Sequence, residues 1–127
     1  MLSYVPLIGR IGLSLIFLFN GILKLLAFDQ TWHKIDLAGI PMAPLVLVLA
    51  IMIELGCGIS VLIGFNARAA AWVLLIYLIP TTFIFHAFWV NQVELEHFLK
   101  NIALIGGLLF VAHHGAGPMS LDAKKLW

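Results

Sequence analysis

The feature that most constrains this chain is a set of four apolar stretches, each long enough to cross a lipid bilayer. They cover about residues 5–28, 43–65, 67–90 and 97–114. A helix needs about 20 apolar residues to span the hydrocarbon core of a membrane. Backbone polar groups in lipid are satisfied only within helices or closed barrels. The sequence therefore predicts an all-α fold, an integral membrane four-helix bundle, with residues 1–127 forming a single membrane domain.

The composition fits a protein that uses lipid as its solvent. Hydrophobic residues make up 63% of the chain and charged residues only 10%, which leaves too few polar side chains to cover a soluble globule. The formal net charge is +1, so a basic surface for nucleic acid is not expected. The single cysteine, Cys57, lies inside an apolar stretch. It has no intrachain disulfide partner, and no cysteine–histidine spacing predicts a metal site.

The charges outside the spans predict the orientation. Asn20 and Lys24 lie within the first apolar stretch, so we interpret it as a retained helix rather than a signal peptide. Four spans place both termini on one side of the membrane. The turn and tail on that side carry Arg68 and two C-terminal lysines, whereas the loops on the other side are mainly acidic. By the positive-inside rule, both termini are predicted to be cytoplasmic.

Glu54 is the ionisable residue that most needs an explanation. It lies near the middle of the second stretch, where a charge costs about 2.5–3.5 kcal/mol even on insertion scales. Glu54 is therefore expected to be neutral or paired, and Arg10, two turns inside the first stretch, is the expected partner. The pair is interpreted either as a proton or charge pair beside a ligand cavity, or as a structural ion pair that fixes helix pairing.

A second group of polar residues shares one depth near the outer membrane face. We expect it to line a half-polar pocket that opens outward, in which the His86 imidazole and the Asn101 amide would suit the oxygens and flat ring of a quinone. The alternative is that lysines and tryptophans at helix ends anchor the protein to the interface. The group consists of Asn20, Lys24, His86, Trp89, His97, Lys100 and Asn101.

Small residues on the second stretch suggest a helix contact. Gly56, Ser60 and Gly64 recur every four residues, and such residues permit close approach of helices in lipid. Glu54 lies on roughly the opposite side of this helix, because two residues turn a helix by about 200°. The sequence therefore predicts contacts on both sides of the helix, either within a compact bundle or at the boundary with another subunit.

These residues, in this order and spacing, resemble the DoxX family of small four-helix membrane proteins. The resemblance covers essentially the whole chain, from Arg10 to Asp122. It rests on Arg10, Phe17, Gly21 and Lys24; Glu54-Leu55-Gly56-Cys57-Gly58; Gly64 to Arg68; Phe85-His86-Ala87-Phe88; Lys100-Asn101; Gly106-Gly107; and Gly117-Pro118-Met119-Ser120-Leu121-Asp122. Cys57 departs from the glycine that is common in the family, and Asn66-Ala67 departs from the threonine that is common before the arginine.

The resemblance implies a location and a class of function. It implies a multi-pass protein of the bacterial inner membrane that is a component of a redox or thiol-stress complex with oxidoreductase activity, and a quinone is the expected ligand. The family positions carried over are Arg10, Lys24, Glu54, Arg68, His86 and Asn101.

Two functions from different classes follow. In the first, the bundle is a redox accessory subunit that binds a quinone or similar hydrophobic ring, and electrons come from a partner subunit because the chain has no cofactor motif of its own. In the second, it is a non-catalytic membrane scaffold or a carrier of a lipid-like small molecule. Both predict the bilayer as one partner, and either a homo-oligomer or another membrane or redox subunit as a second.

Overall fold

The computed structural model describes residues 4–85, 92–118 and 120–124, and this part of the chain is almost entirely helical. Four of the helices, α1, α3, α4 and α5, are long and apolar enough to cross a membrane, which confirms the predicted all-α, four-span architecture. The elements are α1 (Tyr4–Leu26), α2 (Phe28–Leu37), α3 (Ala43–Ile63), α4 (Ala67–Phe85), the 3-10 turn η1 (Gln92–Glu94), α5 (Leu95–His114) and α6 (Leu121–Lys124).

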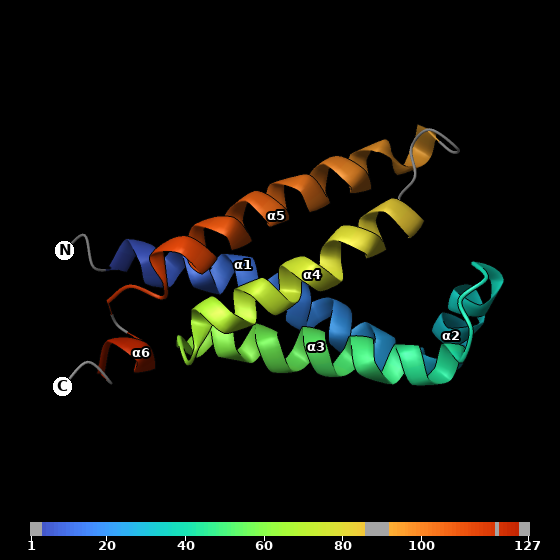
Figure 1. Cartoon of the computed structure of the whole chain (residues 1–127), viewed down its shortest axis with the longest axis horizontal. Coiled ribbons are helices and arrows are strands. Elements are labelled where there is room, and N and C mark those ends of the chain that lie inside the picture. Colours follow the sequence, from blue (N-terminus) through green and yellow to red (C-terminus); the bar gives the residue numbers. More distant parts are fainter. Residues whose placement is uncertain (1–3, 86–91, 119, 125–127) are drawn as a thin grey trace.

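The four long helices form two pairs that share one junction. α1 packs mainly on α3, α4 packs mainly on α5, and α3 contacts α4, whereas α1 and α5 touch over a short length only. In Figure 1 the α4–α5 pair diverges from α3 toward the end at which α2 lies, and the beginning of α1 and the short α6 lie together at the other end. The two helix pairs therefore lie closer together near α6 than near α2 (Figure 1).

Glycines set the close approach of α1 and α3. A Cβ atom at Gly21 would lie 2.7 Å from Cδ2 of Leu55, and one at Gly58 would lie 3.1 Å from Cδ2 of Leu18. Small residues at such points let two helix backbones approach closely, which is how helices gain packing energy in lipid. The face of α3 that carries Gly58 and Glu54 therefore turns toward α1.

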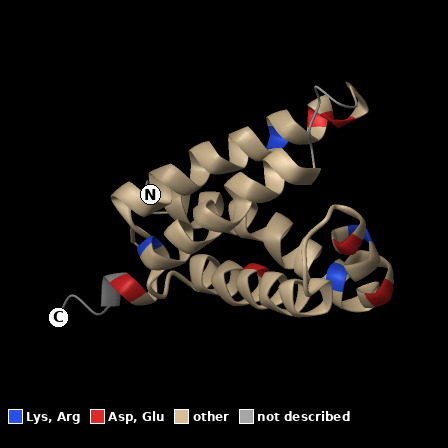
Figure 2. Cartoon of the chain, turned by 45° about the vertical axis from the view of Figure 1, so that its right-hand side comes forward, with Lys and Arg blue, Asp and Glu red and all other residues tan. Residues whose placement is uncertain are grey.

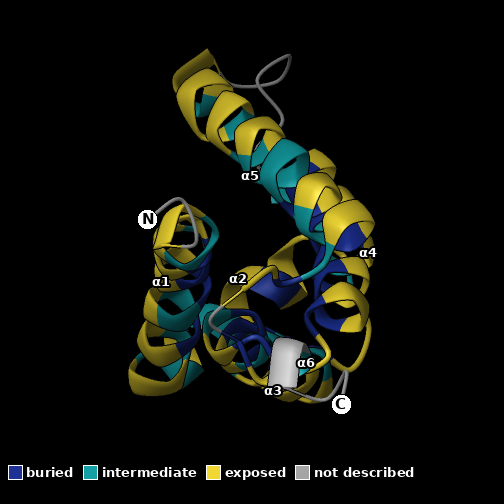
Figure 3. Cartoon of the chain, turned by 90° about the vertical axis from the view of Figure 1, so that its left-hand side faces the viewer, coloured by how far each residue is buried: buried dark blue, intermediate teal, exposed yellow. Residues whose placement is uncertain are grey.

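The apolar side chains divide between a narrow core and a broad outer surface. Phe17, Leu74 and Leu108 are at most 3% exposed and belong to the central core cluster. Many other large apolar residues are exposed, and exposed segments, yellow in Figure 3, occur along all four long helices. A hydrophobic outer surface is what a bilayer requires of a membrane-spanning bundle.

The connection between the first two spans contains a helix, α2, that the sequence pattern had assigned to a loop. Phe28, Trp32 and Ile35 follow one another at intervals of four and three residues, which places them on one helical face. Ile35 is 6% exposed and packs in a second core cluster with Leu47. Pro44 stands at the beginning of α3, as expected. Because α2 is too short to span a membrane, the span pattern alone did not reveal it.

Candidate functional site

The site begins with Glu54, the single charged residue of α3. Most other charged residues lie near the two ends of the bundle, and the red segment within α3 in Figure 2 stands apart from them. Glu54 is 2% exposed. A charged group in this position requires partners, because the desolvation of an ion is costly unless the ion is paired and hydrogen-bonded.

Two side chains from neighbouring helices meet the Glu54 carboxylate. The Lys24 ammonium of α1 lies 2.5 Å from Oε1 of Glu54, and the Tyr77 hydroxyl of α4 donates a hydrogen bond to the same oxygen. We refer to Lys24, Glu54 and Tyr77 as the Glu54 cluster. It ties together α1, α3 and α4, the three helices around the junction of the bundle.

The two oxygens of this carboxylate have different surroundings. Oε1 accepts from both Lys24 and Tyr77, whereas Oε2 is buried and has no hydrogen-bond partner among the residues that the structure describes. The Lys24 side chain is 25% exposed and that of Glu54 is 3% exposed. The cluster thus combines a buried acceptor that lacks a donor with a cation that reaches the surface.

Arg10 does not occupy the place beside Glu54 that the sequence suggested. Its guanidinium Nη1 donates to the carbonyl oxygens of Val61, at 3.2 Å, and Leu62, at 2.9 Å. Val61 lies seven residues beyond Glu54, which is about 10 Å along a helix. α1 therefore packs against α3 at a depth that places Lys24 beside the Glu54 carboxylate and Arg10 beside the last residues of α3.

The C-terminal segment folds back onto the turn between α3 and α4. The Asp122 carboxylate accepts from the backbone N–H groups of Asn66, at 2.7 Å, and Ala67, at 2.9 Å, and the Asp122 N–H donates to the Gly64 carbonyl at 2.8 Å. Gly64 has a φ of +75°, and a Cβ atom there would lie 2.2 Å from Cβ of Ser120. We refer to Gly64, Asn66, Ala67, Ser120 and Asp122 as the tail clamp.

Gly64 and Gly56, two members of the predicted small-residue stripe, have different surroundings. Gly64 contacts the tail within the same chain, whereas a Cβ atom at Gly56 would meet nothing within 4 Å.

Arg68, a family position at the beginning of α4, lies beside Gly115: a Cβ atom at Gly115 would be 2.9 Å from Nε of Arg68. The end of the bundle near α6 is therefore held by contacts between side chains and backbone.

The structure brings together only part of the predicted outer pocket. The Asn101 amide of α5 donates to the Thr82 hydroxyl of α4 at 3.0 Å, and that hydroxyl donates to the Leu78 carbonyl at 2.7 Å. Lys24 turns instead to Glu54. His86 and Trp89 lie outside the residues that the structure describes.

The remaining predicted members of that pocket are dispersed. Lys100 is exposed and lies 3.8 Å from Glu96 of the same helix, and His97 is also exposed. Asn20 is half-buried and lies seven residues after Leu13, the residue of α1 that contacts α5 at Gly107. Because seven residues are close to two helical turns, Asn20 lies on the face of α1 that turns toward α5.

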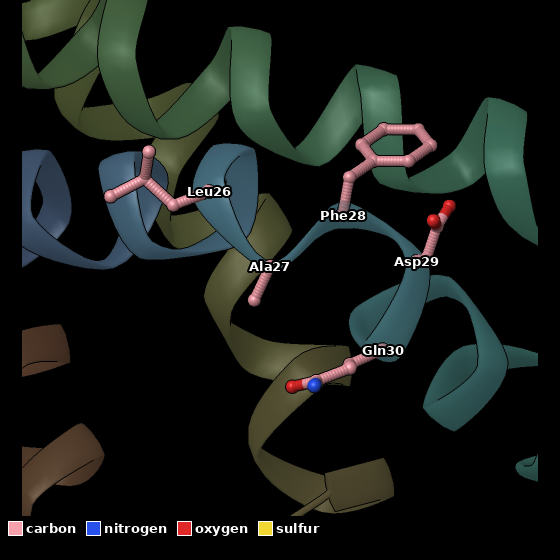
Figure 4. A pocket seen from close by; sticks show the side chains of 5 residues that line it. All are labelled: Leu26, Ala27, Phe28, Asp29 and Gln30. Atoms are coloured by element: carbon pink, nitrogen blue, oxygen red, sulfur yellow. The ribbon is translucent and has the colours of Figure 1, made fainter.

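A hollow lies at the C-terminal end of α1, where the chain turns into α2. It has a volume of about 340 Å³ and is lined by Leu26, Ala27, Phe28, Asp29 and Gln30, as Figure 4 shows. None of these residues belongs to the predicted ligand group. The hollow is wide open, with no buried polar group in its lining, so the Glu54 cluster is the stronger candidate site.

Two functional candidates were not among the residues predicted from the sequence. Tyr77 carries a hydroxyl in the middle of an apolar helix, and a buried tyrosine hydroxyl usually has a partner, so its position alone was a usable signal. Asp122 was noted only as part of the family tail. Its contact with Asn66 joins positions 56 residues apart, and no local pattern in the sequence specifies such a pairing.

Comparisons with known proteins agree with this architecture. The DoxX family profile matches residues 5–87. The chain is 32% identical over 123 residues to the inner membrane protein YphA of Escherichia coli (strain K12), covering 93% of this chain and 88% of that protein. It is 32% identical over 125 residues to the inner membrane protein YqjF of the same organism, covering 95% and 93%.

A eukaryotic relative is matched over a smaller share of its own length. The Surfeit locus protein 4 homolog of Schizosaccharomyces pombe (strain 972 / ATCC 24843) is 32% identical over 130 residues, which is 97% of this chain but 38% of that protein. No solved structure matches the chain. The family match covers well over half of the sequence, and both Escherichia coli relatives align over nearly their full lengths. This multi-pass membrane protein belongs to the DoxX family.

Proposed function

We propose that this chain is an inner-membrane accessory subunit of a redox system and that it binds a quinone, or a similar hydrophobic ring, at the Glu54 cluster. The location follows the names of the two Escherichia coli relatives, and the redox association follows the family resemblance. One observation carries the binding proposal. A carboxylate in the middle of a membrane span has a buried oxygen to which none of the described residues donates a hydrogen bond, and a partly exposed lysine lies next to it.

The residues around the cluster suit such a ligand. An ammonium group has three N–H donors, and in the described residues Lys24 directs one of them to Glu54. The others are available to the oxygen of a ligand. Leu55, whose side chain lies beside Gly21 of α1, and the Tyr77 ring supply apolar surface close to Glu54. Binding sites for small molecules are mostly apolar and contain a few polar groups that fix the orientation of the ligand.

Each member of the cluster has a distinct part in this proposal. Lys24 would hold a ligand oxygen, while Glu54 balances the lysine charge in the membrane and Tyr77 fixes the orientation of the carboxylate. The lysine ammonium and the tyrosine hydroxyl both hold protons directed at Oε1 of Glu54. A bound quinone would supply the two-electron chemistry, and a partner subunit would supply or remove the electrons.

The test is to identify what the purified protein carries. The full chain is extracted in a mild detergent, and its absorbance spectrum and the mass spectrum of its extracted ligands are recorded. We expect a quinone in stoichiometric amount. The double substitution Lys24→Met with Glu54→Gln keeps the cluster electrically neutral and should lose most of this quinone, whereas Asp122→Asn, at the other end of the bundle, should retain it.

Phospholipid alone in the wild-type extract, together with no binding of added quinone, would contradict the proposal. Equal quinone in all three proteins would place the binding away from the Glu54 cluster. The first of these results would turn attention to the second candidate, a non-catalytic membrane scaffold or carrier.

One observation favours that second candidate. In an apolar stretch of 18 residues within Gln92–His114, which contains α5, 11% of the residues are buried. In the equivalent stretches of α3 and α4, 33% of the residues are buried. An outer helix with so little burial offers a large face to lipid or to another membrane protein. Crosslinking in native membranes tests this reading. Gly106→Leu on α5 should abolish a crosslinked assembly if α5 forms the contact, whereas Gly56→Leu should abolish it if the small-residue face of α3 forms the contact instead.

A further inference from the structure

The two carboxylate oxygens of Glu54 have different hydrogen-bond partners, and this difference indicates which chemical group a bound ligand presents to the site. Oε1 accepts from Lys24 and Tyr77, whereas Oε2 is buried and lacks a donor among the described residues. An ionised carboxylate only accepts hydrogen bonds. A buried acceptor without a partner costs about 1–3 kcal/mol, and more when it is charged. The group that completes this site must therefore present a hydrogen-bond donor to Oε2.

Lys24 has the opposite requirement. Its ammonium group only donates hydrogen bonds, and its side chain is 25% exposed beside the buried carboxylate. A ligand at this point meets a donor and an acceptor side by side. A carbonyl oxygen satisfies the lysine alone. A hydroxyl group satisfies both, because its hydrogen is donated to Oε2 while its lone pairs accept from Lys24.

From this geometry we infer, on the basis of the proposed function, that the Glu54 cluster selects the hydroquinone form of its ligand over the oxidised quinone. The chain already contains one example of the contact. Tyr77 is a phenol, and its hydroxyl donates to Oε1 of Glu54. A hydroquinone offers the same phenolic group to the neighbouring oxygen, Oε2. A carboxylate that accepts one phenolic hydroxyl in this membrane-embedded position is chemically suited to accept a second.

The burial of the cluster argues for a ring rather than for a small polar molecule. Glu54 lies in the middle of a 21-residue apolar helix, and α1 packs so closely on α3 that Gly21 contacts Leu55. The Lys24 side chain is 25% exposed and flexible, so a ligand would approach the cluster from the side of Lys24. A hydroxyl that reaches this depth from the bilayer must be attached to an apolar body, and the flat ring of a hydroquinone provides one.

The test compares the two redox forms of one ligand on the full chain. A tail-less benzoquinone and its hydroquinone are equilibrated anaerobically, by dialysis, with the protein in nanodiscs, and the bound amounts are determined by chromatography. We expect the hydroquinone to bind about tenfold or more tightly than the quinone, which is the effect of one hydrogen bond to a charged group. The control variant Asp122→Asn should show the same ratio.

Glu54→Gln should bring the two affinities to within about threefold of each other, because the amide can both donate to a carbonyl and accept from a hydroxyl. The wild-type comparison requires no variant, so it decides the inference even if Glu54→Gln fails to fold.

The other outcomes separate the two proposals. Equal affinity of the wild type for both forms would overturn the preference and leave quinone binding intact. No binding of either form would overturn both. A competition arm adds phosphatidylglycerol, a lipid with headgroup hydroxyls, to the nanodiscs. If it displaces the hydroquinone at a concentration comparable with the hydroquinone itself, the site recognises hydroxyl groups in general and the assignment to a ring is wrong.

Discussion

The Glu54 cluster and the tail clamp are both polar, yet they use their polar groups differently. In the tail clamp, the Asp122 carboxylate accepts from two backbone N–H groups at the beginning of α4. Such groups are without partners at any helix N-terminus, so capping them is a structural requirement. In the Glu54 cluster the contacts join side chains, no backbone group requires them, and one carboxylate oxygen has no donor among the described residues.

This difference separates a structural polar site from a candidate binding site. A carboxylate at a helix end lowers the free energy of the fold by itself, without another molecule. A carboxylate buried in a membrane span raises that free energy unless its partners compensate for desolvation. The incomplete hydrogen bonding of Glu54 is therefore the feature that an external group could explain, and substitutions in the two regions should have different consequences.

The largest effect is expected for Lys24→Met. It removes the cation that lies 2.5 Å from Glu54 and leaves a buried carboxylate without its countercharge, a change that costs about 3–5 kcal/mol in buried pairs. We expect a corresponding fall in the free energy of unfolding, measured by denaturant titration in mixed micelles. Adding Glu54→Gln should restore much of the loss, and the double-mutant cycle gives the coupling between the two residues. Wild-type stability in the single variant would contradict the ion pair.

The next effect concerns Gly64 in the tail clamp. Gly64→Ala places a Cβ atom on a residue with a φ of +75° and 2.2 Å from Cβ of Ser120. The left-handed conformation alone costs about 1–3 kcal/mol for such a residue. The matched control is Gly56→Ala, at which a Cβ atom meets nothing within 4 Å. The control should be neutral, or more stable by about 0.5–1 kcal/mol because it removes a mid-helix glycine. Equal effects at the two positions would contradict the docked tail.

A smaller loss is expected for Asp122→Ala. This substitution removes the carboxylate that accepts from Asn66 and Ala67, and the loss of such a cap costs about 0.5–2 kcal/mol. Thermal unfolding in detergent measures it. Ligand binding at the Glu54 cluster should not change, because Gly64 of the clamp lies ten residues beyond Glu54, about 15 Å along the helix axis. A changed preference between hydroquinone and quinone would mean that the two regions are coupled through the bundle.

The sequence predicted the spans well because their signal is local. Length and hydropathy in a continuous segment define a membrane helix. The observed α1, α3 and α5 begin and end within about two residues of the expected bounds, whereas the expected end of the third span lies outside the described residues. The helix α2 was missed although Phe28, Trp32 and Ile35 have helical spacing, because a segment of ten residues carries no span signal. Its fold depends on packing against α3, which brings Ile35 to Leu47.

The site was harder to predict because it depends on how deep one helix lies against another. The sequence identified Glu54 and Lys24 as notable residues but paired the carboxylate with Arg10. A shift of two helical turns in the packing of α1 on α3 changes which cation is opposite the carboxylate, and no local pattern specifies that shift. Gly21 and Gly58, at which the two helices approach closely, are the residues that fix the depth.

The smallest effect is expected at the contact between α4 and α5. Thr82→Val keeps the side-chain shape but removes the acceptor for Asn101, 3.0 Å away. Hydrogen bonds between membrane helices contribute about 0.6 kcal/mol on average, so the free energy of unfolding should fall by about that amount, and the ligand preference should not change. If Thr82→Val instead weakens hydroquinone binding, Asn101 belongs to the ligand site, as the sequence suggested. The site would then extend from the Glu54 cluster across α4 to α5, because Thr82 is the residue through which Asn101 reaches α4.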